Sequence, residues 1–393
     1  MRAVTVPYVG ELNLTDVARG DGYLFVREGV GIAGRGVAAR VPIDEAVEFL
    51  AAIDHHDRVG ETPGPIAIGA VPFLPGSSAD LIIPAVMVGR DASGRQWTTT
   101  IDDIPLDSVS SPTHPTPTSR SWTIGSDIDI DHYLTAVMTA RDEVAAGNLR
   151  KAVIARPIRV SADGPIDLHA VLRRLEATFR TSYRFSIDGF IGASPELLVS
   201  VNGTAVSSFP LAGTTRTTGD DELDARLAAE LHRSPKNRIE HAAAIEMVRD
   251  TLLPYCSYLD WTPSPEIVKV ANVQHLGSRA EGMLSRPTAT VIDLVRALQP
   301  TPAVGGYPRD DAIEVIRRVE GFERGLYGGA VGWCDGSGNG TWAVSLRCAE
   351  FSDDRCSARL VAGGGIVADS APVEELAETQ AKFQAMLGAI VRP

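Results

Sequence analysis

The sequence predicts a globular α+β protein built around antiparallel β-structure. Two segments, 183–209 and 326–367, are predicted β-meanders, because each alternates short β-forming runs with Gly, Asn and Asp turn residues. A helix-forming stretch follows each meander, over 222–253 and from residue 373 onward. The two meander-plus-helix blocks indicate an internally duplicated layout, although no sequence repeat is visible.

The first hundred residues predict strands but no chemistry. They alternate short β-like runs with Gly and Pro, which is typical of the strands of a sheet. Residues 29–34 match the GxGxxG spacing of dinucleotide-binding proteins, but no helix-forming segment follows them, so this interpretation lacks its structural context. Residues 108–121 are rich in Pro, Ser and Thr and predict an exposed loop, in which His114 is solvated.

The pattern strengthens after this loop. A helix is predicted over 130–146, since the following Gly147 is typical of a helix end. A strand over 150–160 comes next, and the dipeptide Asn202-Gly203 predicts a hairpin turn within the first meander. Further helices are predicted near 167–180, 288–299 and 309–320.

The bulk composition restricts the class of protein. With 393 residues, of which 44% are hydrophobic, the chain is long enough for one large core or two ordinary ones. The formal net charge of −13, without a cluster of Lys and Arg, argues against a nucleic-acid-binding surface. The apolar runs are too short to cross a membrane, and the first residues lack the apolar core of a signal peptide, so we expect a cytoplasmic protein. The cysteines show neither zinc nor disulfide spacing and are expected to be free thiols: Cys256, Cys334, Cys348 and Cys356.

One strip of the C-terminal helix carries charges beside its apolar stripe. At about 100° per residue, Glu375, Glu378 and Lys382 fall on one side, next to the residues that face the core. The plainest interpretation is a solvated helix face with an ion pair between Glu378 and Lys382. On the helix predicted over 222–253, Glu240 likewise lies at the edge of an apolar face. Carboxylates from two helices at a buried edge would suit Mg²⁺, which prefers oxygen ligands.

Two residues on predicted strands are candidates for proton transfer. Lys151 shares a strand face with Val153 and Ala155, where it is either a strand-end lysine that reaches water or a desolvated general base. Glu196 follows Pro195 at the start of a strand. It either caps the rim of the sheet or acts as a general acid, since a carboxyl group at an apolar cleft retains its proton more easily.

The second meander carries two features that suit a carboxylate-bearing ligand. Arg347 shares a strand face with the small residues Ala343 and Ser345, which leave room for a ligand that its guanidinium can bind in a fork. The glycines at 363–365 expose backbone N–H groups that no side chain shields. Both features favour an anionic small molecule.

The last two thirds of the chain contain a series of distinctive segments: KAVIAR, ASPELLVS, PLAGTTR, SPKNRIEH, VQHLG, PTPAVGGYP, RGLYGGAVGWCDGSGNG, SLRCAEF, AGGGIV and ELAETQAK. Together they resemble the chorismate-utilising enzymes, which include isochorismate, salicylate and anthranilate synthases. The resemblance implies one chorismate-binding α/β domain over 1–393, with two large antiparallel β-sheets packed face to face and helices outside. Residues 125–390 would form its catalytic core, and residues 1–120 a weakly matching, β-rich N-terminal part.

The resemblance also implies a Mg²⁺ site. Glu240 and Glu378 match the residues that bind the metal directly in the family, and Glu375 matches the acid that holds a metal-bound water. Lys382 matches a lysine beside the bound ligand. Asn237 stands where most relatives carry an acid, and its amide oxygen can still accept a hydrogen bond from water.

The family resemblance further implies how the substrate is bound and attacked. Members that use ammonia lack a lysine at the position of Lys151, so this chain resembles a water-using enzyme. In such an enzyme Lys151 would activate the water that attacks C2 of chorismate, and Glu196 would protonate the departing C4 hydroxyl. The implied substrate-binding residues are Gly213, Thr214, His275, Ala303, Tyr327, Arg347, Gly363, Gly364, Gly365 and Lys382.

Among the water-using enzymes, the sequence favours an isochorismate synthase. Salicylate synthases share the first step and then eliminate pyruvate, but they carry Thr where Ala303 stands. Two further hypotheses are an aminating synthase, which Lys151 disfavours, and an inert ligand-binding relative. We expect a monomer that needs no glutaminase subunit, nucleic acid or membrane. The sequence leaves open whether a siderophore, salicylate or menaquinone pathway uses the product.

Overall fold

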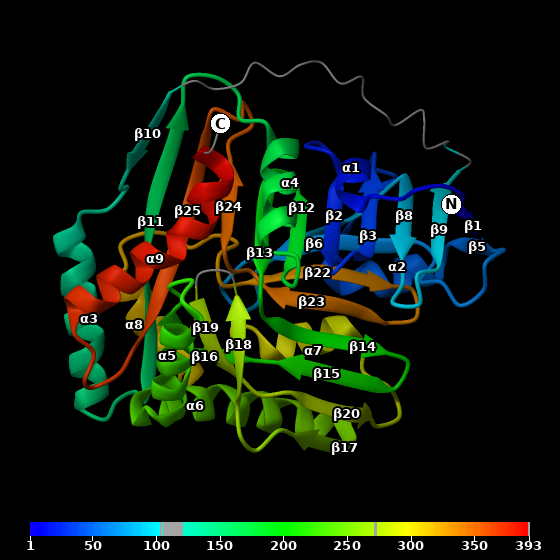
Figure 1. Cartoon of the computed structure of the whole chain (residues 1–393). Coiled ribbons are helices and arrows are strands. Elements are labelled where there is room, and N and C mark those ends of the chain that lie inside the picture. Colours follow the sequence, from blue (N-terminus) through cyan, green and yellow to red (C-terminus); the bar gives the residue numbers. More distant parts are fainter. Residues whose placement is uncertain (103, 105–120, 271–272, 392–393) are drawn as a thin grey trace.

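Two large β-sheets form the frame of the protein, and their strands run crosswise in Figure 1. The computed structural model describes residues 1–102, 104, 121–270 and 273–391, so most of the predicted loop at 108–121, including His114, lies outside the described residues. The larger sheet has the order β10 (Trp122–Gly125), β11 (Lys151–Ala162), β25 (Ser357–Ile366), β24 (Cys348–Phe351), β13 (Phe190–Ser194), β12 (Tyr183–Ile187), β2 (Tyr23–Arg27), β3 (Val30–Arg35), β8 (Val86–Arg90), β9 (Gln96–Ile101), β1 (Arg2–Pro7) and β5 (Asp54–Asp57), with β21 (Gly306–Tyr307) paired to β11.

The second large sheet and a small third sheet complete the β-structure. The second sheet has the order β17 (Cys256–Trp261), β20 (Ala280–Leu284), β15 (Ala205–Phe209), β14 (Leu197–Asn202), β23 (Gly340–Val344), β22 (Ala330–Asp335), β6 (Ile66–Val71), β7 (Asp80–Ile83) and β4 (Ala39–Pro42). The third sheet, which the sequence did not predict, contains β16 (Leu211–Arg216), β19 (Val273–Gly277) and β18 (Glu266–Val270). Within the described residues every strand pair is antiparallel except β1 with β5.

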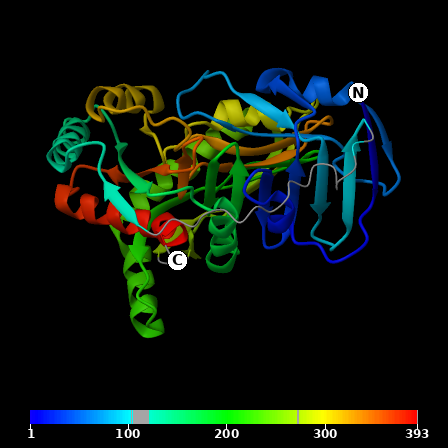
Figure 2. The ribbon, with the colours of Figure 1, turned by 90° about the horizontal axis from the view of Figure 1, so that it is seen from above.

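Helices cover the outside of the sheets. At one end of the molecule, opposite the N-terminal strands, α3 contacts both α9 and α8 (Figure 2). No helix of the described ranges is long and apolar enough to cross a membrane. The helices are α1 (Leu14–Ala18), α2 (Ala46–Ala51), α3 (Ile130–Ala145), α4 (Leu168–Thr178), α5 (Asp221–Arg233), α6 (Pro235–Leu252), α7 (Val291–Leu298), α8 (Arg309–Val319) and α9 (Pro372–Val391), with short 3-10 turns at η1 (Ile43–Glu45) and η3 (Leu253–Tyr255).

Strand β2 shows how the larger sheet is buried on both faces. Successive residues of a strand point to opposite faces of its sheet. Phe25 therefore joins the core between the two large sheets, together with Phe185 and Trp342. Its neighbour Leu24 joins a second hydrophobic cluster on the outer face, under α1, α4 and α9. The larger sheet is thus the middle layer between the second sheet and these helices.

Most predicted strands and helices are confirmed, but the two β-meanders and one helix are wrong. Each predicted meander consists of two hairpins, one in each large sheet: β12–β13 and β14–β15 in the first segment, β22–β23 and β24–β25 in the second. The sequence indicated one continuous helix over 222–253, whereas the structure has α5 and α6 with a break at Ser234. Pro235 is the first residue of α6, where its missing N–H costs nothing, and the Ser234 side chain accepts a hydrogen bond from the backbone N–H of Asn237. This break sets the start of the helix that carries Asn237 and Glu240.

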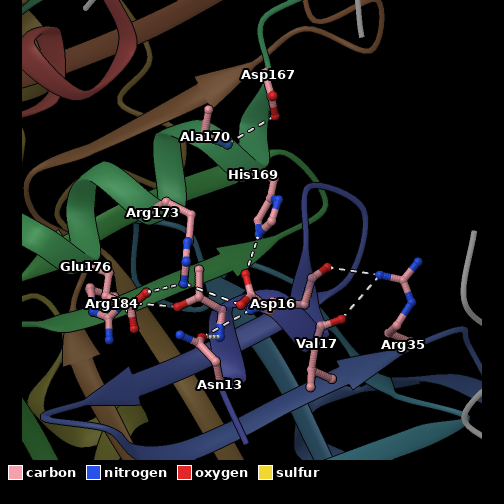
Figure 3. A network of polar contacts seen from close by, with 12 residues as sticks. Asn13, Asp16, Val17, Arg35, Asp167, His169, Ala170, Arg173, Glu176 and Arg184 are labelled. Atoms are coloured by element: carbon pink, nitrogen blue, oxygen red, sulfur yellow. Dashed lines mark hydrogen bonds and ion pairs between the residues drawn. The ribbon is translucent and has the colours of Figure 1, made fainter. Parts of the chain in front are cut away.

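The first hundred residues contribute strands to both large sheets. Six of their strands join the larger sheet and three the second sheet, so their side chains share one core with the C-terminal part. A polar network also connects α1 with α4 (Figure 3). In it, Asp16 contacts His169 at 2.9 Å and Arg173 at 3.4 Å, and the buried Arg184 lies 3.5 Å from Glu176. Over the described residues, the N-terminal and C-terminal parts thus share a core and a polar network, while the single domain over 1–393 stays a prediction.

A core substitution in the N-terminal part tests this single-domain prediction. Phe25 is 3% exposed and stacks on Tyr183 at 5.5 Å, which joins the N-terminal strands to the C-terminal part. We expect Phe25→Ala to lower the free energy of unfolding by about 3–5 kcal/mol, because it leaves a cavity in the shared core. The whole chain should still unfold in one transition, measured by guanidinium titration with fluorescence and circular dichroism.

The control for this test is Phe49→Ala, at a phenylalanine that is 39% exposed. It should change the free energy of unfolding by no more than about 0.5 kcal/mol. Two separate transitions, of which Phe25→Ala shifts only one, would contradict the single domain.

Candidate active site

One cavity lies where the small sheet, α6, β25 and α9 meet. Its empty space, including the part open to solvent, is about 730 Å³, and it combines charged groups with an apolar wall. The predicted site residues that line it are Glu196, Gly213, Thr214, Glu240, His275, Ala303, Tyr327, Arg347, Gly363, Gly365 and Lys382. The other predicted site residues, Lys151, Asn237, Gly364, Glu375 and Glu378, are not part of the lining.

Lys151 contacts the cavity wall through Glu240. It is the first residue of β11, its whole residue is 1% exposed, and its Nζ lies 2.8 Å from Oε1 of Glu240. Burial raises the pKa of the Glu240 carboxyl, but the adjacent Lys151 ammonium outweighs this effect, so the pKa lies below its ordinary value. Gly365 makes this contact feasible, because a Cβ there would lie 2.4 Å from Oε1 of Glu240 and 2.7 Å from Cε of Lys151.

Glu196 is a buried carboxyl group without a close cation. The residue is 1% exposed, and its Oε1 has no hydrogen-bond partner. Burial raises its pKa to about 8, which outweighs a backbone hydrogen bond at Leu211 and the more distant charge of Lys151. The group is therefore protonated at neutral pH and can donate a proton into the cavity, as a general acid must.

The three predicted metal-binding carboxylates are each paired with a lysine. Glu240 contacts Lys151 at 2.8 Å, Glu375 contacts Lys236 at 3.1 Å, and Glu378 contacts Lys382 at 2.6 Å. Burial and the charge of Glu378 raise the pKa of the Glu375 carboxyl. Over the parts of the chain that the structure describes, no three His, Cys, Asp or Glu side chains are close enough together to hold a metal ion. In this arrangement the positive charges of the three lysines balance the negative charges of the three carboxylates.

The chemistry of these donors nevertheless suits Mg²⁺. The acids on α6 and α9 supply oxygen ligands, which Mg²⁺ prefers, and Oε2 of Glu375 is buried without a hydrogen-bond partner. Both helices lie close to glycines of β25. A Cβ on Gly364 would lie 2.6 Å from Oε2 of Glu375 on α9, and a Cβ on Gly365 would lie 2.4 Å from Oε1 of Glu240 on α6. The oxygen chemistry of these residues therefore suits a small cation.

Asn237 lies one turn before Glu240 on α6, beside Gly213. Its Nδ2 donates a hydrogen bond of 3.0 Å to the Ser234 hydroxyl. A Cβ on Gly213 would lie 3.2 Å from Oδ1 of Asn237, and Gly213 has a φ of +76°, a left-handed conformation that favours glycine. Asn237 thus orients the α6 start against the cavity wall.

The other side of the cavity provides groups that suit a carboxylate. Arg347 is buried and its Nη1 has no hydrogen-bond partner. Lys382 donates a hydrogen bond of 2.8 Å to the carbonyl of Gly363. Burial lowers the pKa of the Lys382 amine, but the Glu378 carboxylate outweighs it and the pKa is raised, so the amine keeps its charge. An anionic ligand would satisfy the unpaired guanidinium.

His275 is neutral and offers a free acceptor. Burial, together with the charges of Arg347 and Lys382, lowers its pKa to about 3. Its Nδ1 lies 3.3 Å from the carbonyl of Gly213 and 3.1 Å from the hydroxyl of Thr214. Since a carbonyl only accepts, this contact assigns the proton to Nδ1 and leaves Nε2 as an acceptor without a partner. The residue therefore suits a hydroxyl group of a ligand.

The sequence missed Lys236 and the apolar wall of the cavity. Lys236 stands four residues before Glu240 on α6, so both side chains lie on one helix face. This spacing was the signal in the sequence that could have identified Lys236 as a site residue. Its partner Glu375 also accepts a hydrogen bond of 2.8 Å from the Ser370 hydroxyl. The apolar wall consists of residues that no charge pattern marks: Leu211, Ala212, Leu346, Leu360, Val361, Ala362, Phe383 and Met386.

The sequence model of one family, described as "Chorismate binding enzyme", matches residues 81–391. This chain belongs to the chorismate-binding enzymes. The predicted resemblance is thereby confirmed, and the matched segment begins earlier than the expected catalytic core at residue 125.

Relatives of this chorismate-binding enzyme cover most of its length. Isochorismate synthase DhbC of Bacillus subtilis is 37% identical over 337 residues, which span 83% of this chain and 81% of DhbC. Isochorismate synthase EntC of Escherichia coli is 34% identical over 348 residues, which span 86% of this chain and 84% of EntC. The solved structure of MenF, the menaquinone-specific isochorismate synthase from Escherichia coli, aligns with a TM-score of 0.84 and 25% identity, over 99% of this chain and 94% of that one. The predicted fold is confirmed.

The protonation of Glu196 predicts a pH-dependent stability difference. Its folded pKa of about 8 lies above the ordinary value of 4.5, so the folded state binds more protons than the unfolded state between these pH values. The contribution of Glu196 to stability is therefore present at low pH and is lost as the pH rises through about 8. Glu196→Gln should be more stable than the parent at pH 8.5 by up to a few kcal/mol, with the difference shrinking toward pH 5.

This difference can be measured by denaturant titration of both proteins at about four pH values. The control is Glu281→Gln, at a carboxylate whose side chain is 64% exposed. If the free energies of unfolding of the parent and of Glu196→Gln change with pH in the same way from pH 5 to pH 8.5, Glu196 has an ordinary pKa.

Proposed function

We propose that this protein is an isochorismate synthase, which converts chorismate to isochorismate. The observation that carries the proposal is the protonated Glu196 in the same cavity as Arg347 and Glu240, whose partner is Lys151. The relatives that span most of the chain carry the name isochorismate synthase, which supports the same reaction. The family that the chain belongs to binds chorismate, so the substrate class follows from the family.

The reaction needs one group that takes a proton and one that gives a proton. Water adds at C2 of chorismate and the hydroxyl group at C4 departs, so the product is an isomer of the substrate. Lys151 would first have to lose the proton that it carries beside Glu240. As a neutral amine it would then take the proton of the attacking water, and Glu196 would protonate the departing hydroxyl, which leaves as water. One proton is taken and one is given, which returns the overall charge of the protein to its starting value.

The remaining cavity residues would hold the substrate. Arg347 and the backbone N–H groups at 363–365, with Tyr327 beside them, would bind the enolpyruvyl carboxylate, and Nε2 of His275 would accept a hydrogen bond from a ring hydroxyl. The apolar wall keeps bulk water away from these charged groups, which strengthens their interaction with the ligand.

We further propose that the enzyme needs Mg²⁺. Glu240 and Glu378 would be its ligands, and Glu375 and Asn237 would lie beside it. When bound, the ion would balance the charge of the ring carboxylate of the substrate.

A salicylate synthase is the second candidate, and Ala303 argues against it. Ala303 lines the cavity, and the salicylate synthases that the sequence resembles carry Thr there. Lys151 argues against an aminating reaction. The presence of all the proposed acid, base and carboxylate-binding groups argues against an inert relative.

We also propose a monomeric, cytoplasmic enzyme without a glutaminase subunit. Its four cysteines are all free, which suits a reducing compartment.

The product assay tests the proposed function. Purified protein is incubated with chorismate and Mg²⁺, and the products are separated by chromatography. We expect isochorismate without pyruvate, because the Ala303 position favours release after the first step. EDTA should abolish turnover, and added Mg²⁺ should restore it. Pyruvate in equal amount, detected with lactate dehydrogenase, would instead support salicylate synthase, and unconsumed chorismate would refute both.

Substitution of the proposed base gives a second test. Lys151→Ala should reduce turnover by about 10²–10⁴-fold, because it removes the proposed acceptor for the proton of the attacking water. Chorismate binding, measured by calorimetry, should persist since Arg347 and Lys382 are unchanged. The neighbouring Arg150→Ala, at a side chain that is 52% exposed, is the control. Turnover equal to that of the control would remove Lys151 as the base.

A further inference from the structure

A buried ion pair next to the cavity connects several of its walls. Glu320 directly follows α8 and Arg324 stands four residues later, with side chains that are 1% and 2% exposed. The guanidinium binds the carboxylate in a fork: Nε donates to Oε2 at 2.8 Å and Nη2 donates to Oε1 at 2.5 Å. Neither residue lines the cavity itself.

The same two side chains hold two backbone segments that carry proposed site residues. Nη1 of Arg324 donates to the carbonyl of Val304 at 2.7 Å, and Val304 follows Ala303. Nη2 of Arg324 donates to the carbonyl of Val153 at 2.7 Å, and Oε1 of Glu320 accepts from the N–H of Ala155 at 2.7 Å. Val153 and Ala155 belong to β11, the strand that begins at Lys151. The pair thus fixes the Ala303 loop and the Lys151 strand to each other.

Two aromatic residues complete this connection. The Arg324 guanidinium lies over the ring of Phe73 at 4.2 Å, and Phe73 belongs to the N-terminal part. The carbonyl of Arg324 accepts a hydrogen bond of 3.2 Å from the N–H of Tyr327, which lines the cavity. One arginine therefore contacts the strand of the proposed base, the loop of Ala303 and the backbone of Tyr327.

The chemistry of the pair favours positioning over simple stabilisation. A guanidinium is planar and its N–H groups point in fixed directions, so it sets the distance between the carbonyls of Val153 and Val304. A buried ion pair is seldom more stabilising than a well-packed apolar pair of similar size, because both charges lose their water. A lysine would keep the charge but could not keep the fork.

We propose that Arg324, oriented by Glu320, is a positioning residue that sets the Lys151 strand against the loop of Ala303. This inference rests on the proposed function, because it assigns Lys151 to the chemical step. A shift of about 1 Å in the base can reduce a rate about 100-fold. His275, on the small third sheet, is held instead by its contacts with Gly213 and Thr214. The pair should thus affect the chemical step more than substrate binding.

The test compares Arg324→Lys with Arg184→Lys. Arg184 is an equally buried arginine, 2% exposed, whose contacts with Glu176 and Thr15 lie in the α1–α4 network away from the cavity (Figure 3). For Arg324→Lys we expect kcat per folded molecule to fall about 10- to 100-fold, with KM for chorismate within about threefold of the parent. Arg184→Lys should leave both constants nearly unchanged. Equal kcat values in the two variants would overturn the proposal.

A second variant covers the case in which Arg324→Lys does not fold. Glu320→Met combined with Arg324→Met replaces the ion pair by an apolar pair, which removes the hydrogen bonds without leaving a buried unpaired charge. We expect this protein to fold and to melt below the parent temperature, because the backbone groups of Val153, Ala155 and Val304 lose their partners, and to show the same loss of kcat per folded molecule. A kcat like that of the parent would overturn the proposal.

The outcomes also separate this inference from the proposed function. The parent is assayed first, and the absence of isochorismate among its products would refute the proposed function. The kcat values are measured as consumption of chorismate, so the comparison of variants holds whichever product forms. An active parent with an equally active Arg324→Lys would refute the positioning role alone.

Discussion

Balanced charge at buried and half-buried groups is the constraint on which the cavity depends. Three carboxylates reach this region from α6 and α9, and each lies within 3.1 Å of a lysine ammonium. A buried charge without a partner would be too costly to keep. Glu196 has no close cation, so it avoids a buried charge by keeping its proton. The same constraint yields ion pairs beside the cavity and a neutral acid in its wall.

The residues that the sequence could identify are those that break a pattern. Lys151 and Glu240 were found because a charge on an apolar face of a strand or helix is unusual, and Arg347 because small residues surround it. The family resemblance supplied the roles of Asn237 and His275, which have no such pattern. Strand order could not be predicted, because β25 pairs with β11 across almost two hundred residues of chain. The break at Ser234 was missed because helical periodicity continues on both sides of it, although Ser234 followed by Pro235 is typical of a helix start.

The Glu320–Arg324 pair shows why local spacing alone misleads. Glu and Arg four residues apart normally indicate an exposed ion pair on a helix surface. Here the helix α8 ends before the pair, and both side chains turn into the interior toward backbone groups of β11 and the segment around Val304. Only the three-dimensional arrangement distinguishes a solvated pair from one that joins separate parts of the chain.

The sheet order places the N-terminal strands next to interior strands of the C-terminal part. β12 pairs with β2, and β22 pairs with β6, so each of these C-terminal strands has an N-terminal neighbour. All five residues of β12 are buried. A shortened protein that began after the N-terminal strands would expose two apolar strand edges with unsatisfied backbone groups, and such edges recruit strands from other molecules. The N-terminal part of the chain thus protects the C-terminal part from self-association.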